Sequence, residues 1–220
     1  MLSLYNSEEQ LKKYIEEKNK WDTQTSKNMD WVLLQKHLCK HSYQNIWSTK
    51  YIHDLLPTAN IRHRYNNKEM AACTTCSCPK ETWQHVLVCK GEEYQKITKK
   101  IQLDIFCTID NIIPTQHRFI IKMGISQSIG LQYGDITELS PLQQQIYDKQ
   151  TQIGWIKFLK GFWTKQWGTI PILCINDSGI TADWRIKVLE SIWQAMSEWW
   201  KAYTRKLHTS TEDQPTIKQK

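Results

Sequence analysis

The sequence predicts a mostly α-helical protein, in which a small helical module built around a paired Cys/His motif is followed by a C-terminal helical hairpin. Three observations support this fold class. Apolar residues recur at intervals of three and four over most of the 220 residues, and several of these segments begin with a capping signal. The four motif residues fall in two close pairs, which is the pattern of a compact module and not of a long sheet.

The first 125 residues are predicted to form one helical domain. Its helices share a polar N-cap or a proline at the start, followed by apolar residues at helical spacing. They are expected after Ser7, over 31–38 after Asp30, over 43–56, over 59–65 after Thr58, from Trp83 after Thr82, over 92–106, and from Thr115 to Met123. Pro57 ends the third helix because proline cannot continue it.

A change of pattern separates this domain from the rest of the chain. Residues 126–140 contain two glycines and no helical period, so they are predicted to be a linker. The run Ser140-Pro-Leu-Gln143 then combines an N-cap, a first-turn proline and a capping-box glutamine, which predicts a helix over 141–167 that can bend at Gly154 and Gly161. Residues 170–175 favour an extended loop over a strand, because Pro171 cannot donate to a ladder.

The last helix is the clearest element of the sequence. Its apolar residues alternate at spacings of three and four: Ile186, Leu189, Trp193, Met196, Trp200, Tyr203 and Leu207. We expect this stripe to pack against the 141–167 helix as an antiparallel hairpin over 141–208, with a homodimeric seam as the alternative. Residues 209–220 are polar and are expected to form a disordered tail.

The paired motif has the spacing of a metal site. Cys73-Thr-Thr-Cys76 is followed eight residues later by His85-Val-Leu-Val-Cys89. Zinc takes four thiolate or imidazole ligands, usually as two close pairs, so the motif predicts one structural zinc ion on a zinc knuckle and a short helix. Four protein ligands leave no open position for a catalytic water, and a chance cluster of reduced cysteines is the alternative interpretation.

Two further groups of possible ligands are weaker. Cys78 follows Cys76 too closely for the usual knuckle and is interpreted as a spare thiol, able at most to replace a ligand. His37 and His41 lie four residues apart and could share a helix face, with Cys39 between them. Without a second close pair, an ordinary helix face is the preferred interpretation.

Charge and cysteine usage limit the partners and the compartment. The net charge of +7 and the pI near 9.0 favour an anionic partner, most often nucleic acid. Seven cysteines, four of them in metal spacing, favour a reducing compartment. We find neither an apolar leader nor a run of roughly 18 apolar residues, so an intracellular protein of the nucleus or cytoplasm without membrane contact is expected.

Basic residues flank the motif on both sides. They are predicted to contact phosphates of RNA or DNA, with Tyr65 or Trp83 as a stacking surface. The candidate nucleic-acid-binding residues are Arg62, Arg64, Tyr65, Lys68, Lys90, Lys96, Lys99 and Lys100. We identify no helix suited to reading bases, so binding should be sensitive to salt and weakly sequence-specific. Charge composition does not distinguish RNA from DNA.

Residues 40–95 carry a family resemblance in three elements that occur in order. These are the run Trp47-Ser-Thr-Lys-Tyr-Ile-His-Asp-Leu-Leu-Pro-Thr58, the Cys73/Cys76 pair, and Glu81-Thr-Trp-Gln-His85 with Cys89. Together they resemble the reverse-transcriptase zinc-binding domain of non-LTR retrotransposon polyproteins. The resemblance implies a zinc-stabilised accessory module with ligands at Cys73, Cys76, His85 and Cys89, next to a polymerase of the same polyprotein as a possible partner.

The sequence gives no indication of an enzyme. Two-metal nucleotidyl transfer needs clustered carboxylates on strands, whereas the aspartates here are scattered over predicted helices and loops. The alternative function is a zinc-stabilised scaffold that binds a partner protein through tryptophan-rich C-terminal helices. Trp163, Trp167 and Trp199 lie beside lysines and are candidates for surface stacking, whereas Trp31, Trp47, Trp193 and Trp200 lie at core-facing positions.

Overall fold

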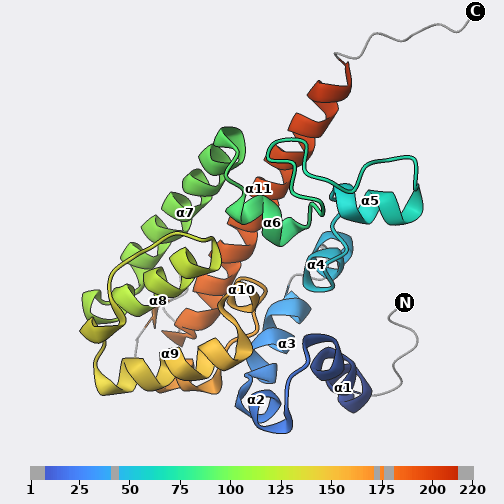
Figure 1. Ribbon diagram of the computed structural model, residues 1–220. Helices are drawn as coiled ribbons and strands as arrows, with labels where there is room; N and C mark the ends of the chain where they lie inside the picture. Colours follow the sequence, from blue (N-terminus) through green and yellow to red (C-terminus); the bar gives the residue numbers. More distant parts are fainter. Residues whose placement is uncertain (1–7, 41–44, 171–173, 176–180, 213–220) are drawn as a thin grey trace, which may run out of the picture.

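The computed structural model describes residues 8–40, 45–170, 174–175 and 181–212 (Figure 1). In chain order the helices are α1 (Glu8–Asn19), α2 (Thr23–Asn28), α3 (Trp31–Lys40), α4 (Asn45–Ile52), α5 (Ala59–Tyr65), α6 (Trp83–Val88), α7 (Glu92–Ile112), α8 (Thr115–Ser128), the 3-10 helix η3 (Ile136–Glu138), α9 (Pro141–Ile153), α10 (Trp155–Phe158), the 3-10 helix η4 (Lys165–Thr169) and α11 (Trp184–Glu212). Strands β1 (Cys174–Ile175) and β2 (Thr181–Ala182) pair antiparallel. The mostly α-helical fold class is confirmed.

Local capping explains where several helices begin. The Ser140 backbone N–H donates to Gln143 Oε1 at 3.0 Å and the Gln143 N–H donates to Ser140 Oγ at 3.4 Å, which is the capping box expected from the sequence. Asp22 caps α2, a helix that was not expected from the sequence, by accepting from the Thr25 N–H at 2.6 Å. These bonds satisfy backbone donors that the first helical turn leaves unpaired.

The long helix α11 crosses the molecule behind α6 and α10 (Figure 1). Its most extensive contacts are with α7, and it also packs on α3. Lys206 pairs with Glu93, the rings of Tyr203 and Tyr94 are 5.8 Å apart, and Ser191 donates to Thr108 at 2.8 Å. Residue numbers increase along α7 while those of the contacting residues in α11 decrease, so the two helices are antiparallel.

The expected hairpin between residues 141–167 and the last helix is therefore wrong in its partner. Helix α7 presents a buried stripe with helical spacing: Tyr94, Thr98, Ile101, Ile105 and Ile109. That stripe is the surface on which α11 buries its own apolar face, and buried residues from Ile15 to Tyr203 share one core cluster. Residues on both sides of the predicted linker at 126–140 contribute to this core.

The predicted helix over 141–167 was also wrong beyond Ile153. Gly154 has φ of +107° and Gly161 has φ of +90°, a backbone region that favours glycine; Gly154 is the C-cap of α9, and Gly161 lies in the turn that follows α10. A Cβ on Gly161 would lie 3.2 Å from side-chain atoms of Leu34 and of Leu189, so this turn passes close to α3 and α11. The breaks fold the chain back on itself instead of extending it.

This folded-back segment places aromatic rings in the core. Trp163 and Trp167 of this segment are buried, as is Trp199 of α11, so none of these three candidates offers a surface for stacking. Phe158 and Trp163 stack with ring centroids 4.2 Å apart, and Trp167 Nε1 donates to Gln150 Oε1 at 3.0 Å. Buried indole N–H groups usually find such an acceptor. Of the tryptophans predicted to pack, Trp193 and Trp200 are buried, and Trp31 and Trp47 lie half-buried against the same core.

Helix ends differ from the sequence expectation at several points. Helix α4 ends at Ile52 instead of Leu56, and Asp54 follows with φ of +58°. Helix α11 continues to Glu212, so the expected disordered tail was wrong for 209–212, while 213–220 lie outside the described residues. None of the described helices combines the length and the apolar character needed to cross a membrane.

We expect Gly124→Ala to destabilise the fold. Gly124 is buried in α8, and a Cβ there would lie 1.8 Å from Cζ3 of the buried Trp155 ring. Overpacking costs about 1–3 kcal/mol, and so close a contact should fall in the upper part of that range despite the better helix propensity of alanine. Urea unfolding measures the loss. Gly168→Ala is the control, because its Cβ meets only the guanidinium end of Arg185. Equal stability of the two variants would contradict this account of the core.

Candidate metal centre

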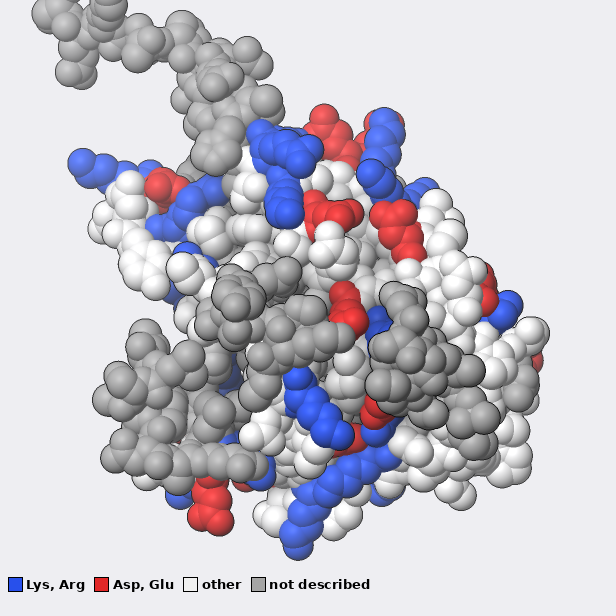
Figure 2. Space-filling view, turned by 180° about the vertical axis from the view of Figure 1, so that it is seen from behind, with Lys and Arg blue, Asp and Glu red and all other residues white. Residues whose placement is uncertain are grey.

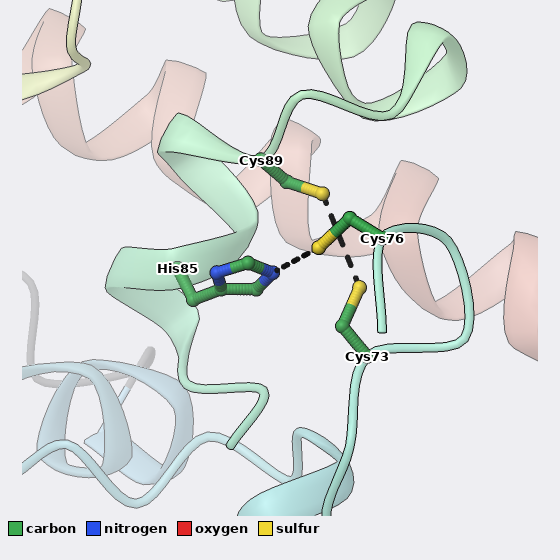
Figure 3. A group of neighbouring side chains, drawn as sticks. All are labelled: Cys73, Cys76, His85 and Cys89. Carbon is green, nitrogen blue, oxygen red and sulfur yellow. Dashed lines mark hydrogen bonds between the residues drawn. The ribbon is translucent and has the colours of Figure 1, made fainter. Parts of the chain in front are cut away.

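Four side chains from the loop after α5 and from the α6 segment converge on one point (Figure 3). The ligand atoms of Cys73, Cys76, His85 and Cys89 all lie within 4.8 Å of one another. Cys73 Sγ is 3.9 Å from Cys89 Sγ, and Cys76 Sγ is 3.2 Å from His85 Nε2. Thiolates held about 2.3 Å from a tetrahedral ion are about 3.8 Å apart, so the spacing fits one metal ion.

The Cys73–Cys76 knuckle is shaped by its own backbone. The Ser77 N–H donates to the Cys73 carbonyl at 3.0 Å, and the Cys73 N–H donates to the Cys78 carbonyl at 2.8 Å. Ser77 adopts φ of +57°, which is uncommon for a residue other than glycine and turns the chain back. Cys78 lies outside the group of four, with its Sγ 3.8 Å from the Lys80 carbonyl oxygen.

The other two ligands come from α6 and the residue that ends it. Thr82 caps the helix by accepting from the His85 N–H at 3.1 Å, as the sequence predicts. Cys89 is the C-cap residue, so it lies just beyond the last helical turn. The Gly91 N–H approaches Cys89 Sγ at 3.5 Å, and a Cβ on Gly91 would lie 2.0 Å from Thr75 Cγ2 in the knuckle. Glycine at 91 therefore lets the two halves of the site approach.

Burial differs among the three thiols and so does their acidity. Burial raises the pKa of Cys73 to about 12 and also raises the pKa of Cys89. A backbone hydrogen bond from Cys78 lowers the pKa of Cys76, which is exposed. Metal ligation needs thiolates, so metal binding would displace protons from the two buried thiols. Cys76 and His85 form the outer side of the site.

Glu81 joins the metal-site segment to three helices. Its buried carboxylate accepts from the Ala59 N–H at the start of α5 at 3.0 Å, from the Tyr94 hydroxyl of α7 at 3.3 Å, and from the Tyr203 hydroxyl of α11. Burial, followed by the hydrogen bond to Glu81, raises the pKa of Tyr203 well above its usual value. Glu81 also donates its backbone N–H to the Ala71 carbonyl at 2.8 Å, just before the knuckle.

Asp54 attaches α6 to the body of the protein. Its Oδ1 accepts from the Trp83 indole and from Gln84 Nε2 at 2.7 Å, and it pairs with Lys160 Nζ at 2.5 Å. Lys160 also lies 4.8 Å from the centroid of the Trp83 ring, and burial lowers its pKa to about 8. Trp83 is buried, so it offers no stacking surface to a nucleic acid. The bonds from Asp54 to Lys160 and from Glu81 to Tyr203 were not expected, because no local pattern links residues more than a hundred positions apart.

The eight candidate nucleic-acid contacts are Tyr65 and seven cations, two of which form ion pairs. Arg62 pairs with Glu69 at 2.8 Å and Lys96 with Glu92 at 2.6 Å. The others are exposed and make no ion pair with a described residue: Arg64, Tyr65, Lys68, Lys90, Lys99 and Lys100. They lie on or beside α5 and α7, which flank α6 in Figure 1. Figure 2 shows basic and acidic side chains interspersed on the face opposite that view.

The second set of possible ligands is not supported as a metal site. His37 is buried, and its ring packs edge-on against Trp193 with centroids 4.4 Å apart. The side chains of Cys39 and His41 lie outside the described residues. Among described residues, the group around Cys73 is the only set of at least three Cys, His, Asp or Glu side chains placed to hold an ion.

Comparison of the chain with protein-family models, with curated proteins and with solved structures found no significant match.

We expect Tyr203→Phe to destabilise the protein, because it removes one donor from the buried Glu81 carboxylate. A buried polar group left short of a partner costs about 1–3 kcal/mol. Tyr51→Phe is the matched control, since the Tyr51 hydroxyl is equally buried and has no hydrogen-bond partner among the described residues. Chemical unfolding of both variants measures the difference. A loss as large in Tyr51→Phe would show that ring packing, and not the bond to Glu81, is responsible.

Proposed function

We propose that the chain binds one Zn²⁺ ion through Cys73, Cys76, His85 and Cys89, and that this ion is structural. The observation that carries the proposal is the convergence of three thiols and one imidazole within 4.8 Å. A set of three sulfurs and one nitrogen selects zinc over hard cations such as Mg²⁺ or Ca²⁺. Four protein ligands complete a tetrahedral shell, so the ion would hold the knuckle against α6 and leave no position for a reacting water.

We further propose that the zinc-stabilised region contacts nucleic acid through phosphates, as a non-catalytic accessory module. The support is the set of exposed cations on or beside α5 and α7, on either side of the centre, that make no ion pair with a described residue. Such contacts give affinity without base readout, on RNA or DNA alike. The proposed origin in a retrotransposon reverse transcriptase, with a polymerase as neighbour, rests on the sequence resemblance of residues 40–95 alone.

The alternative of a protein-binding scaffold loses its main support. It depended on the tryptophan-rich C-terminal helices, but Trp163, Trp167, Trp184 and Trp199 are buried and fill the core of the chain itself. Rings in those positions stabilise the fold and present no face to a partner. Nucleic-acid contact is therefore the function that the exposed groups favour.

The metal proposal predicts one zinc per chain in protein purified without added metal, measured by elemental analysis. Cys76→Ser should lose the ion, because serine is a poor zinc ligand and Cys76 contributes one of the four ligand atoms. Cys78→Ser should keep it, because Cys78 lies outside the group. A folded wild-type protein without metal would overturn the assignment. Loss of zinc in Cys78→Ser would show that Cys78 is a ligand in place of one of the four residues assigned here.

The nucleic-acid proposal predicts binding that weakens steeply with salt, measured by fluorescence anisotropy on labelled RNA and DNA. Each phosphate contact adds about 0.7–0.9 to the slope of log affinity against log salt. Arg64→Ala and Lys99→Ala should each reduce the slope by about one contact. Lys165→Ala on η4 is the charge-matched control and should leave it unchanged. Absence of binding at low salt, or equal effects of all three substitutions, would contradict the proposal.

A further inference from the structure

The segment 59–72, here called the arm, extends away from the body beside α4 (Figure 1). It consists of α5 and the loop that returns to the knuckle. Its base is fixed, since Ala59 and Ile61 are buried and the N–H groups of Ala59 and Asn60 donate to Glu81. The far end, from Arg64 to Lys68, is exposed throughout. The arm is therefore anchored at one end and presents the other to solvent.

The tip holds its shape through bonds within the arm. Glu69 Oε2 accepts from Arg62 Nε at 2.8 Å, and the Glu69 carbonyl accepts from His63 Nδ1 at 2.6 Å. The Glu69 N–H donates to the Asn66 carbonyl at 3.0 Å, and the Lys68 N–H donates to Asn66 Oδ1 at 3.3 Å. A loop braced in this way presents its remaining side chains in fixed positions, which lowers the entropy cost of binding.

Two large apolar side chains of this braced loop face solvent. Tyr65, the last residue of α5, is 83% exposed, and Met70 is 72% exposed. Removing an aromatic ring from water is favourable, and none of the described elements covers the Tyr65 ring at the tip of the arm. The arrangement is suited to a ligand that supplies a flat apolar face.

The charges beside the ring indicate which ligand that is. Glu69 is neutralised by Arg62, whereas Arg64 and Lys68 are exposed and make no ion pair with a described residue. A ring flanked by unpaired cations matches the combination of stacked base and phosphate contacts found in single-strand binding. In a duplex the base faces are already stacked on one another, so the ring would find no free face there.

We propose that the arm tip is a single-strand binding site, in which Tyr65 stacks on an unpaired nucleobase while Arg64 and Lys68 hold the adjacent phosphates. This inference rests on the proposed nucleic-acid function and specifies its substrate. It also assigns different roles within the arm. Tyr65 discriminates single strands from duplexes, whereas the two cations contribute to the binding of single strands and of duplexes.

The experiment measures the affinity of full-length, zinc-loaded protein for a labelled oligo(U) strand of about 20 nucleotides and for a duplex of equal length. Tyr65→Ala should weaken single-strand binding about 5- to 100-fold, the range for loss of one stacked base, and leave duplex binding unchanged. Tyr65→Phe keeps the ring and should bind both probes as the wild type does. The fluorescence of a 2-aminopurine in the strand should be quenched when the wild type or Tyr65→Phe binds. It should not be quenched when Tyr65→Ala binds.

Each other outcome overturns the inference in a recognisable way. Wild-type binding that is unaffected by Tyr65→Ala would refute the stacking site and leave the proposed function in place. An equal loss on strand and duplex would assign Tyr65 to a general contact surface and not to base stacking. If the wild type binds neither probe at low salt, the proposed function itself fails, and the exposed ring would then indicate a protein partner.

Discussion

The arrangement of the metal site and the long helices depends on one buried carboxylate. Glu81 is 1% exposed, and a carboxylate in such a position costs several kcal/mol unless donors replace its water. Its donors come from α5, α7 and α11, so no two of these helices alone can satisfy it. This requirement fixes α5 and the knuckle relative to the α7 and α11 pair. The Cys/His cluster is therefore positioned in the fold by the hydrogen bonds to Glu81, which lies just before α6.

Local features of the fold were predictable because their signals lie within a few residues of one another. The Ser140 capping box and the Thr82 cap are both formed as predicted, since an N-cap depends only on the next three residues. The prediction of one helix over 141–167 was wrong because the apolar spacing continues across Gly154, whereas the positive φ of Gly154 breaks the helix. The predicted packing partner of α11 was wrong because several helices have an apolar stripe of suitable spacing. Only the assembled core shows that α11 packs on α7.

The same distinction explains what was and was not predictable in the site. The four proposed ligands lie within 17 residues, and their spacing alone brought them together in the prediction. The residues that support them are far apart: Asp54 and Lys160 are separated by 106 positions, and Glu81 and Tyr203 by 122. No sequence pattern marks such pairs, because any buried carboxylate can be satisfied by many different donors. Their identification required the structure.

Helix α6 has only six residues, too few to be stable alone in water, so it needs external support. Asp54 holds its first turn through Trp83 and Gln84, and the Cys/His cluster holds its end. Through Glu81, just before α6, the same segment fixes the base of the arm. A metal ion at this point would therefore stabilise the base of the arm without contacting a nucleic acid bound at the tip of the arm. Under the proposed function, zinc would contribute to nucleic-acid binding by positioning the arm, which needs no open position in a four-ligand shell.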